Sequence, residues 1–138
     1  MKFELLLKEL KSLNLPKNNF AVIHSGVLAV RGIREANDLD IIVTKELWKK
    51  FEKENPVQKN KLGYKIKLSA NIEVMGGRID KQKEDWKFID EQIRHADVIR
   101  GIKYVRLSEV KKIKRILGRK EDLKDIRLID DYLKSGKK

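Results

Sequence analysis

The segment Ser25–Val43, with the sequence SGVLAVRGIREANDLDIIV, decides the fold. It follows Phe20–His24, a short apolar run that is rich in strand-forming residues. The pair Ser25–Gly26 is a turn signal, and Val27–Val30 after it can form a short helix. The segment closes on Leu39–Val43, which has the apolar character of a buried strand. We therefore predict a strand, a turn with a short helix, and a second strand in close succession.

Hydrophobic spacing around this segment predicts the neighbouring elements. Leucines at helical spacing predict a helix over about residues 2–13, and Thr44 can cap a helix that follows the second strand. Apolar residues alternate with lysines around residues 64–68, and together with the run Ile72–Met75 they predict two paired strands. The fold we expect is a mixed β-sheet with helices packed on it, in the α/β or α+β class.

The C-terminal part carries the signals of further helices. We expect a helix over about residues 84–94, a short strand pair around Gly101, and a helix that Ser108 caps and Gly118 stops. A last helix is expected over about residues 120–134. The residues predicted to face inward in the last two helices are Val110, Ile113, Ile116, Leu117, Leu123, Ile126, Ile129 and Leu133.

The organisation of the chain favours a single domain. No repeat, low-complexity run or proline- and glycine-rich linker divides the sequence. A chain of 138 residues also has the size of one ordinary domain. We therefore predict one domain over residues 1–138, with a helical C-terminal part from about residue 108.

The composition excludes several classes of site. Without cysteine there is no disulfide framework, thiolate metal site or cysteine nucleophile. With only two histidines, a multi-histidine zinc site is improbable. The apolar runs are short and the start of the chain lacks the pattern of a signal peptide. We expect a soluble, cytoplasmic protein without membrane contact.

The formal net charge of +12 is the first functional hint. Such a surface attracts polyanions through long-range electrostatics, although it is also typical of a lysine-rich surface that serves only solubility. Residues 100–138 contain 14 basic and 6 acidic residues, so most of the excess lies in this tail. We predict that the tail, including Lys111, Lys112 and Arg115, faces a triphosphate or a polyanionic acceptor.

The most informative feature is a set of carboxylates in predicted strands. Asp38 and Asp40 flank Leu39, so the period of two places both on one face of the strand. Glu73 lies inside the later strand Ile72–Met75, and acidic residues are costly there unless positive charge compensates them. If Glu73 faces the same way, three carboxylates meet, which suits a divalent cation such as Mg²⁺.

Structural explanations exist for each of these residues. An Asp-x-Asp pair at a strand end is often a turn or a cap, and a glutamate on a sheet can face water or pair with lysine. His24, at the end of the first strand, is more typical of a structural hydrogen-bond partner than of a catalyst. The turn Ser25–Gly26 favours a functional explanation, because it offers N–H groups and a hydroxyl to phosphate oxygens.

The segment Ser25–Val43 resembles the signature of the DNA polymerase beta-like nucleotidyltransferase superfamily in its minimal, single-domain form. That signature is a Gly-Gly or Gly-Ser turn, then about ten residues, then Asp-hydrophobic-Asp on a strand, with a third carboxylate on a later strand. Eleven residues separate Gly26 from Asp38 here. The inner segment Gly32–Arg34 is similar to small members related to abortive-infection nucleotidyltransferases.

The tail strengthens the resemblance. Residues 114–126, KRILGRKEDLKDI, are similar to a Lys-x-x-x-Gly-Arg-x-Lys-Asp-Leu-x-Asp-Ile pattern in those proteins. Two positions differ from the family. Ser25 stands at the first glycine of the turn, and Glu121 stands where the family has lysine, with Lys120 one position earlier.

The resemblance implies an Mg²⁺-dependent transfer of a nucleoside monophosphate from a nucleoside triphosphate such as ATP, with release of pyrophosphate. The implied cofactor is Mg²⁺, with Mn²⁺ as an alternative ion. The implied catalytic and metal-binding residues are Asp38, Asp40 and Glu73. The implied nucleotide-binding residues are Ser25, Gly26, Arg34, Lys114 and Arg119.

The acceptor and the partners stay open at this point. The acceptor can be an RNA end, a protein side chain or a small molecule, and its binding can require a homodimer or a partner subunit. Two other classes of function compete with the enzyme. One is a catalytically silent domain of this fold that binds nucleotide, nucleic acid or a protein, and the other is an unrelated basic nucleic-acid-binding module.

Overall fold

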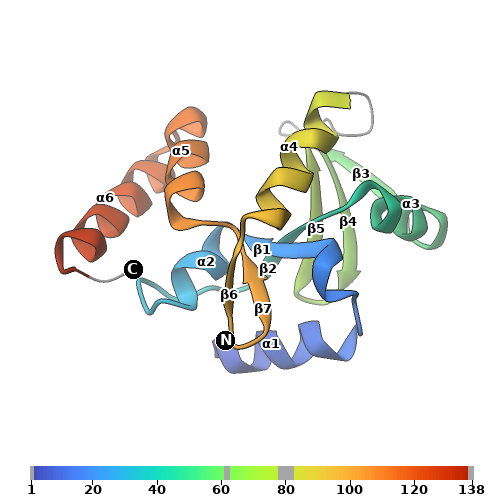
Figure 1. Ribbon diagram of the computed structural model, residues 1–138, viewed down its shortest axis with the longest axis horizontal. Helices are drawn as coiled ribbons and strands as arrows, with labels where there is room; N and C mark the ends of the chain where they lie inside the picture. Colours follow the sequence, from blue (N-terminus) through green and yellow to red (C-terminus); the bar gives the residue numbers. More distant parts are fainter. Residues whose placement is uncertain (1, 61–62, 78–82, 137–138) are drawn as a thin grey trace.

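The computed structural model describes residues 2–60, 63–77 and 83–136. Within these residues the strands form one seven-stranded mixed sheet in the order β3-β4-β5-β2-β1-β7-β6, and helices pack around it (Figure 1). The α+β class predicted from the sequence is confirmed. The elements are α1 Phe3–Ser12, the 3₁₀ turn η1 Lys17–Asn19, β1 Phe20–Ile23, α2 Ser25–Ala29, β2 Leu39–Val43, α3 Lys45–Glu54, β3 Val57–Asn60, β4 Gly63–Ser69, β5 Ile72–Gly77, α4 Lys83–Arg94, β6 Asp97–Ile99, β7 Ile102–Tyr104, α5 Leu107–Leu117 and α6 Lys120–Lys134.

The centre of the sheet consists of β1, β2 and β5. Strand β1 is buried along its whole length and pairs antiparallel with β2, so that Ile23 lies opposite Asp40. Strand β5 pairs with β2 in parallel, and Glu73 lies opposite Asp40. Paired residues in neighbouring strands point to the same face of a sheet. The topology therefore brings together two carboxylates that are far apart in the sequence.

Helices enclose the apolar core of the sheet. The leucines of α1 that are buried, Leu6, Leu7 and Leu10, have the helical spacing seen in the sequence. Helices α3 and α4 meet through Trp48 and Trp86, whose rings cross edge to face with centroids 6.5 Å apart. In Figure 1, α1 lies at the bottom and α4 at the top, with the strands between them.

Helices α5 and α6 form a hairpin beside α2, at the left of Figure 1. Gly118 ends α5 in the left-handed region at φ 60°, as its position predicted. The buried positions of α6 are Asp122, Asp125 and Ile129, so only the last of these agrees with the predicted inward face.

The predicted inward faces of α5 and α6 are therefore partly wrong. Val110 is buried and Ile113 packs against the core, but Ile116 is 83% exposed and Leu123 is 51% exposed. Leu133 is exposed as well. The apolar spacing of the sequence was misleading because charged residues occupy inward positions of both helices. Lys114 lies one turn after Val110 and is buried, since carboxylates on α6 compensate its charge.

Smaller differences concern helix starts and one strand. Helix α5 begins at Leu107 with Arg106 at the N-cap, so Ser108 is a first-turn residue and not the cap. Thr44 is at the N-cap of α3 as predicted, but its hydroxyl accepts a hydrogen bond from Asn19 Nδ2 at 3.0 Å and does not cap the helix. Strand β3 was not predicted. No helix in the described part of the chain is long and apolar enough to cross a bilayer.

Candidate functional site

A cavity of about 410 Å³ lies where β1 ends and β2 begins. Six of the eight residues singled out from the sequence line it, so residues 24–40 and 114–125 meet around one cavity. The residues that line the cavity are His24, Ser25, Arg34, Asp38, Asp40, Met75, Lys114, Leu117, Arg119, Glu121, Asp122 and Asp125. Gly26 and Glu73, the other two singled out, lie next to it through their neighbours in α2 and β5.

One wall of the cavity carries the carboxylates of the central strands. Asp40 on β2 lies opposite Glu73 on β5, and Asp38 lies in the bend just before β2, outside the predicted strand, where it lines the same cavity. Burial and, after it, the negative charges of Asp38 and Glu73 raise the pKa of Asp40 to about 7, while Lys65 and Lys114 oppose the shift. The charged form of Asp40 is therefore disfavoured, first by its burial and second by the two neighbouring carboxylates.

This donor set fits a hard divalent cation, because it consists of carboxylate oxygens and its charge lacks a full counterpart. The oxygens of the three carboxylates nevertheless do not converge on one position that a metal ion could occupy. Glu73 is held by Lys65, whose Nζ lies 3.2 Å from Glu73 Oε2. Among the described residues, no group of three or more histidine or acidic side chains is close enough to hold a metal ion. The three-carboxylate metal site therefore stays a prediction.

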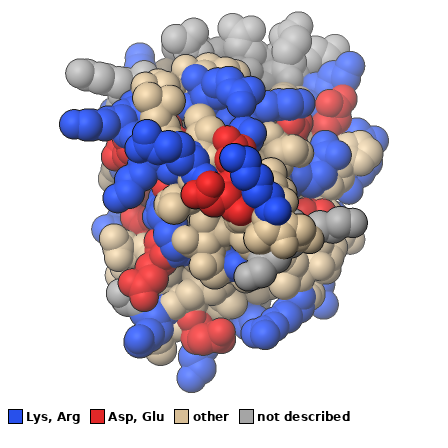
Figure 2. Space-filling view, turned by 90° about the vertical axis from the view of Figure 1, so that its left-hand side faces the viewer, with Lys and Arg blue, Asp and Glu red and all other residues tan. Residues whose placement is uncertain are grey.

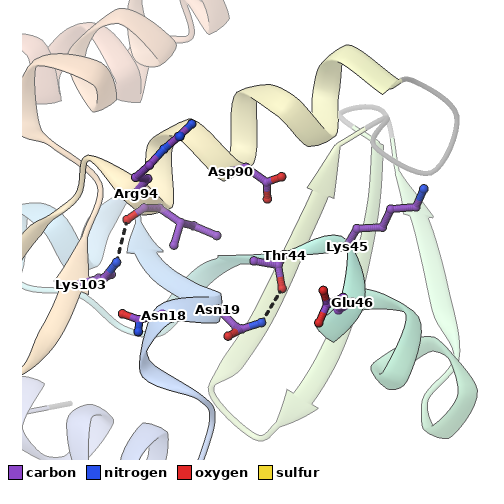
Figure 3. A pocket seen from close by; sticks show the side chains of 9 residues that line it. Asn18, Asn19, Thr44, Lys45, Glu46, Asp90, Arg94 and Lys103 are labelled. Atoms are coloured by element: carbon purple, nitrogen blue, oxygen red, sulfur yellow. Dashed lines mark hydrogen bonds between the residues drawn. The ribbon is translucent and has the colours of Figure 1, made fainter.

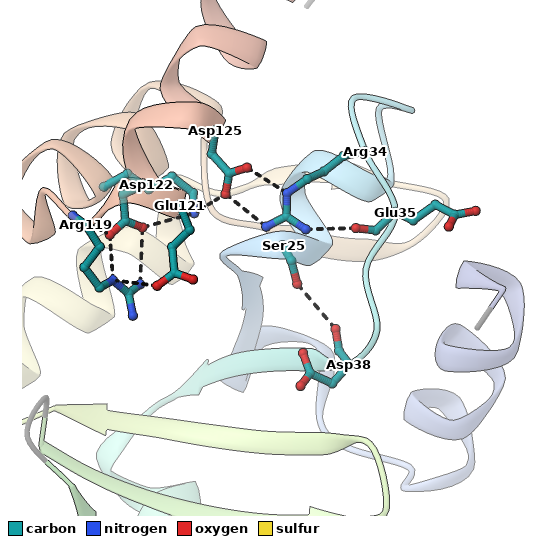
Figure 4. Close-up of polar contacts among 9 residues, drawn as sticks. Ser25, Arg34, Glu35, Asp38, Arg119, Glu121, Asp122 and Asp125 are labelled. Carbon is teal, nitrogen blue, oxygen red and sulfur yellow. Dashed lines mark hydrogen bonds and ion pairs between the residues drawn. The ribbon is translucent and has the colours of Figure 1, made fainter.

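The opposite wall carries a network of ion pairs around the buried side chains of Lys114, Asp122 and Asp125, between the loop before β2 and helices α5 and α6 (Figure 4). Arg34 donates from Nε and Nη2 to the two carboxylate oxygens of Asp125, at 2.8 and 2.9 Å. Lys114 Nζ donates to Asp125 Oδ2 at 2.8 Å, and it lies 3.7 Å from Asp122 Oδ1. Arg119 Nε donates to Asp122 Oδ2 at 2.7 Å. The three basic residues predicted to contact phosphate therefore meet in the same cavity.

Two aspartates hold this wall together. Asp122 is 1% exposed and Asp125 is 5% exposed. Burial by itself raises the pKa of each carboxyl, but the hydrogen bonds and positive charges of Arg119 and Lys114 for Asp122, and of Arg34 and Lys114 for Asp125, outweigh it and lower both pKa values. Sequence reasoning assigned no role to these aspartates. Their spacing of three with Ile129 four residues further is the helical signal that could have placed them on the inward face.

The turn between β1 and α2 is built for close packing. A Cβ atom at Gly26 would lie 2.4 Å from Val22 Cγ1 and 3.0 Å from Leu39 Cδ2. Only glycine allows α2 to pack this closely on β1 and β2. Ser25 lies at the cavity, and its hydroxyl donates a long hydrogen bond of 3.5 Å to the backbone oxygen of Asp38.

His24 is a cavity residue that sequence reasoning set aside. Its backbone has φ 62° and ψ −130°, a combination that residues with a Cβ atom rarely adopt. Burial, together with the nearby charges of Lys114 and Arg119 and against that of Asp122, lowers the pKa of its imidazole to about 4, so the ring is neutral. The predicted role as a structural hydrogen-bond partner finds no support, because nothing in the described part of the chain hydrogen-bonds to this ring.

The charge around the cavity is mixed. Figure 2 views the molecule from the side of α5 and α6 and shows acidic side chains near the middle of this face, with basic side chains around them. Five carboxylates and three basic side chains line the cavity. Of the tail residues predicted to face a polyanion, Lys111 pairs with Asp130 and Lys112 pairs with Glu109, and neither lines the cavity.

A second cavity of about 510 Å³ lies at the other end of β1 and β2 (Figure 3). It is lined in part by Asn18 and Asn19 before β1, by Lys45 and Glu46 at the start of α3, and by Lys103 on β7. Lys103 Nζ donates a hydrogen bond to the backbone oxygen of Ile93 at 3.2 Å. None of the eight residues singled out from the sequence lines this cavity, so the candidate site is the first one.

Comparisons of the chain with family models, with curated proteins and with solved structures found no match.

Proposed function

We propose that the protein is an Mg²⁺-dependent nucleotidyltransferase that transfers a nucleoside monophosphate from a nucleoside triphosphate, with ATP as the first candidate, to an acceptor. The observation that carries the proposal is the pairing of Asp40 with Glu73 at the edge of a cavity whose opposite wall presents Arg34, Lys114 and Arg119. Carboxylates on one side and cations on the other suit a metal-bound triphosphate.

Charge complementarity supports this proposal. The cavity lining contains five carboxylates and three basic groups, so a triphosphate bound there needs further positive charge beside it. Asp38, Asp40 and Glu73 would hold the metal ions, Mg²⁺ or alternatively Mn²⁺, and these ions would neutralise charge on the phosphates and on the developing transition state. A triphosphate should therefore bind only together with divalent cations.

The residues of the chain have distinct tasks in the proposed reaction. Arg34, Lys114 and Arg119 orient the phosphates, and Ser25 offers its hydroxyl at the same rim. The acceptor oxygen forms a bond to the α-phosphorus, the bond from that phosphorus to the bridging oxygen breaks, and pyrophosphate leaves. The proton of the acceptor hydroxyl passes to Glu73, which must first separate from Lys65.

The proposal specifies the acceptor only as a compound with a hydroxyl group. RNA, a protein side chain and a small molecule all offer a hydroxyl, and a homodimer or a partner subunit could complete the acceptor site. The cytoplasmic location stays a prediction from the composition.

The test is release of pyrophosphate from each of the four ribonucleoside triphosphates with Mg²⁺, in the presence of total RNA, of a protein mixture or of sugars and amino alcohols. We expect release with at least one pair and loss of at least about 100-fold in Asp40→Asn, because removal of a metal ligand abolishes positioning of the phosphates. Asp131→Asn, at an exposed position of α6, is the matched control. Equal release by Asp40→Asn and the wild type would overturn the proposal.

A catalytically silent domain that binds nucleotide is the second candidate. The observation that favours it is the ion pair of Glu73 with Lys65, which occupies the third carboxylate. Nucleotide binding without pyrophosphate release under all these conditions would favour this candidate. It also predicts that Glu73→Gln leaves nucleotide affinity unchanged.

A further inference from the structure

We propose that the imidazole of His24 donates a hydrogen bond to the terminal phosphates of the triphosphate, and that the chain keeps histidine at this position despite backbone strain. This inference rests on the proposed function and adds a binding residue to it. The evidence is the backbone conformation of His24, the place of its ring in the cavity, and the lack of a partner for the ring.

The backbone of His24 is unsuited to histidine. At φ 62° and ψ −130° the Cβ atom is crowded by the backbone, and glycine adopts this region without penalty. The conformation is needed because His24 joins β1 to α2, where its carbonyl oxygen accepts the hydrogen bond from the N–H of Val27 at 3.0 Å. Strain of this kind persists where a side chain has a function that a relaxed residue could not perform.

Among the described residues, two others that are not glycine have positive φ, and both differ from His24. Asn14 at φ 51° and Arg100 at φ 50° are exposed and lie at the end of α1 and in the turn between β6 and β7. Neither lines the cavity of the candidate site. His24 is therefore the strained residue of the described chain that lies at the candidate site.

The ring of His24 is positioned for an anionic ligand. It lines the cavity next to Ser25, and the charges that act on it come from Lys114 and Arg119 on the opposite wall and, in the opposite sense, from Asp122. A neutral imidazole has one N–H donor, and the described residues offer that donor no acceptor. A phosphate oxygen between His24, Lys114 and Arg119 would accept from all three. Lys114 and Arg119 also bind the carboxylates of α6, whereas no described residue hydrogen-bonds to the ring of His24, so its N–H is a donor that the ligand can take without breaking a contact.

The test compares His24→Gly with His24→Asn. Glycine removes both the ring and the strain, whereas asparagine tolerates positive φ and keeps an N–H donor. The probes are inorganic tripolyphosphate, ATP and AMP, each with Mg²⁺, with affinities measured by calorimetry and stability by thermal unfolding. Arg100→Gly is the matched control, because it relieves a positive φ away from the cavity.

For His24→Gly we expect a Tm at least about 3 °C above the wild type and affinities for tripolyphosphate and ATP about tenfold lower, from the loss of one hydrogen bond to a charged group. The affinity for AMP should stay within about twofold, because AMP lacks the terminal phosphates. His24→Asn should recover most of the lost affinity. Arg100→Gly should leave all affinities unchanged.

The outcomes separate this inference from the proposed function. Wild-type affinity of His24→Gly for tripolyphosphate and ATP would overturn the inference, even where pyrophosphate release supports the enzyme. Tripolyphosphate binding that depends on His24, in a protein that releases no pyrophosphate, would support the inference and count against catalysis. A wild-type protein that binds neither tripolyphosphate nor ATP would overturn both the inference and the proposed function.

Discussion

The two walls of the cavity differ in how far the charges of their carboxylates are compensated. On the wall from α5 and α6, every buried carboxylate has cationic partners, and the pKa values of Asp122 and Asp125 are lowered. On the wall from β2 and β5, burial and neighbouring carboxylates raise the pKa of Asp40 to about 7. A buried charge that keeps its partner costs the folded chain little, whereas a buried charge without full compensation costs stability and marks a place where a cation can bind.

The largest change in the free energy of unfolding is expected for a substitution on the wall from α5 and α6. Asp125→Ala leaves Lys114, which is 5% exposed, without its 2.8 Å partner and frees Arg34 as well. Uncompensated buried charge should lower the free energy of unfolding by about 3 kcal/mol, measured by urea denaturation at pH 7. Asp131→Ala, on the exposed face of the same helix, should change it by less than about 0.5 kcal/mol. A loss below about 1 kcal/mol in Asp125→Ala would show that this network is not structural.

On the wall from β2 and β5, removal of a negative charge should raise the free energy of unfolding. The folded-state pKa of Asp40 lies above its unfolded value of 3.8, so the unfolded chain loses this proton first. Wild-type stability should therefore fall between about pH 4 and pH 7, and Asp40→Asn should remove that part of the pH dependence.

The measurement is urea unfolding in EDTA at pH 4 and at pH 8. At pH 8 Asp40→Asn should be more stable than the wild type by about 2 kcal/mol, with a smaller difference at pH 4. A substitution that destabilises the protein equally at both values would mean that the charge of Asp40 is compensated after all. That result would remove the contrast between the two walls.

The smallest effect is expected for an ion pair outside the cavity. Lys112 is 71% exposed and lies 3.1 Å from Glu109 in the same helix. Lys112→Ala should lower the free energy of unfolding by about 0.3 kcal/mol, and added salt should weaken the effect. A loss comparable to that of Asp125→Ala would contradict the view that burial gives the charges of the α5 and α6 wall their importance.

Much of the fold could be predicted from local patterns. Strands β1 and β2 are apolar runs beside turn residues, and the leucines of α1 repeat at the helical period. Strand β3 could not be predicted in this way. It is an edge strand with the sequence VQKN, which has one apolar residue and therefore no alternation to detect.

Six of the residues that line the cavity were predicted from the sequence, but their contacts with one another and with Asp122 and Asp125 were not. Asp38, Asp40 and Glu73 stand out because carboxylates are unusual in strands. The inward face of α6 was mispredicted because Asp125 is made tolerable by Arg34, which is distant in the sequence and becomes a neighbour only in the fold. His24 was set aside because residue type alone does not reveal a positive φ.

The most direct test of the central claim is calorimetric titration of ATP into the wild type and Asp40→Asn, with Mg²⁺ and with EDTA. The strand-edge carboxylates are proposed to bind cations that carry the triphosphate into an acidic cavity. We expect binding by the wild type with Mg²⁺ and at least about tenfold weaker binding in EDTA or in Asp40→Asn. Equal affinity under all these conditions would contradict the claim.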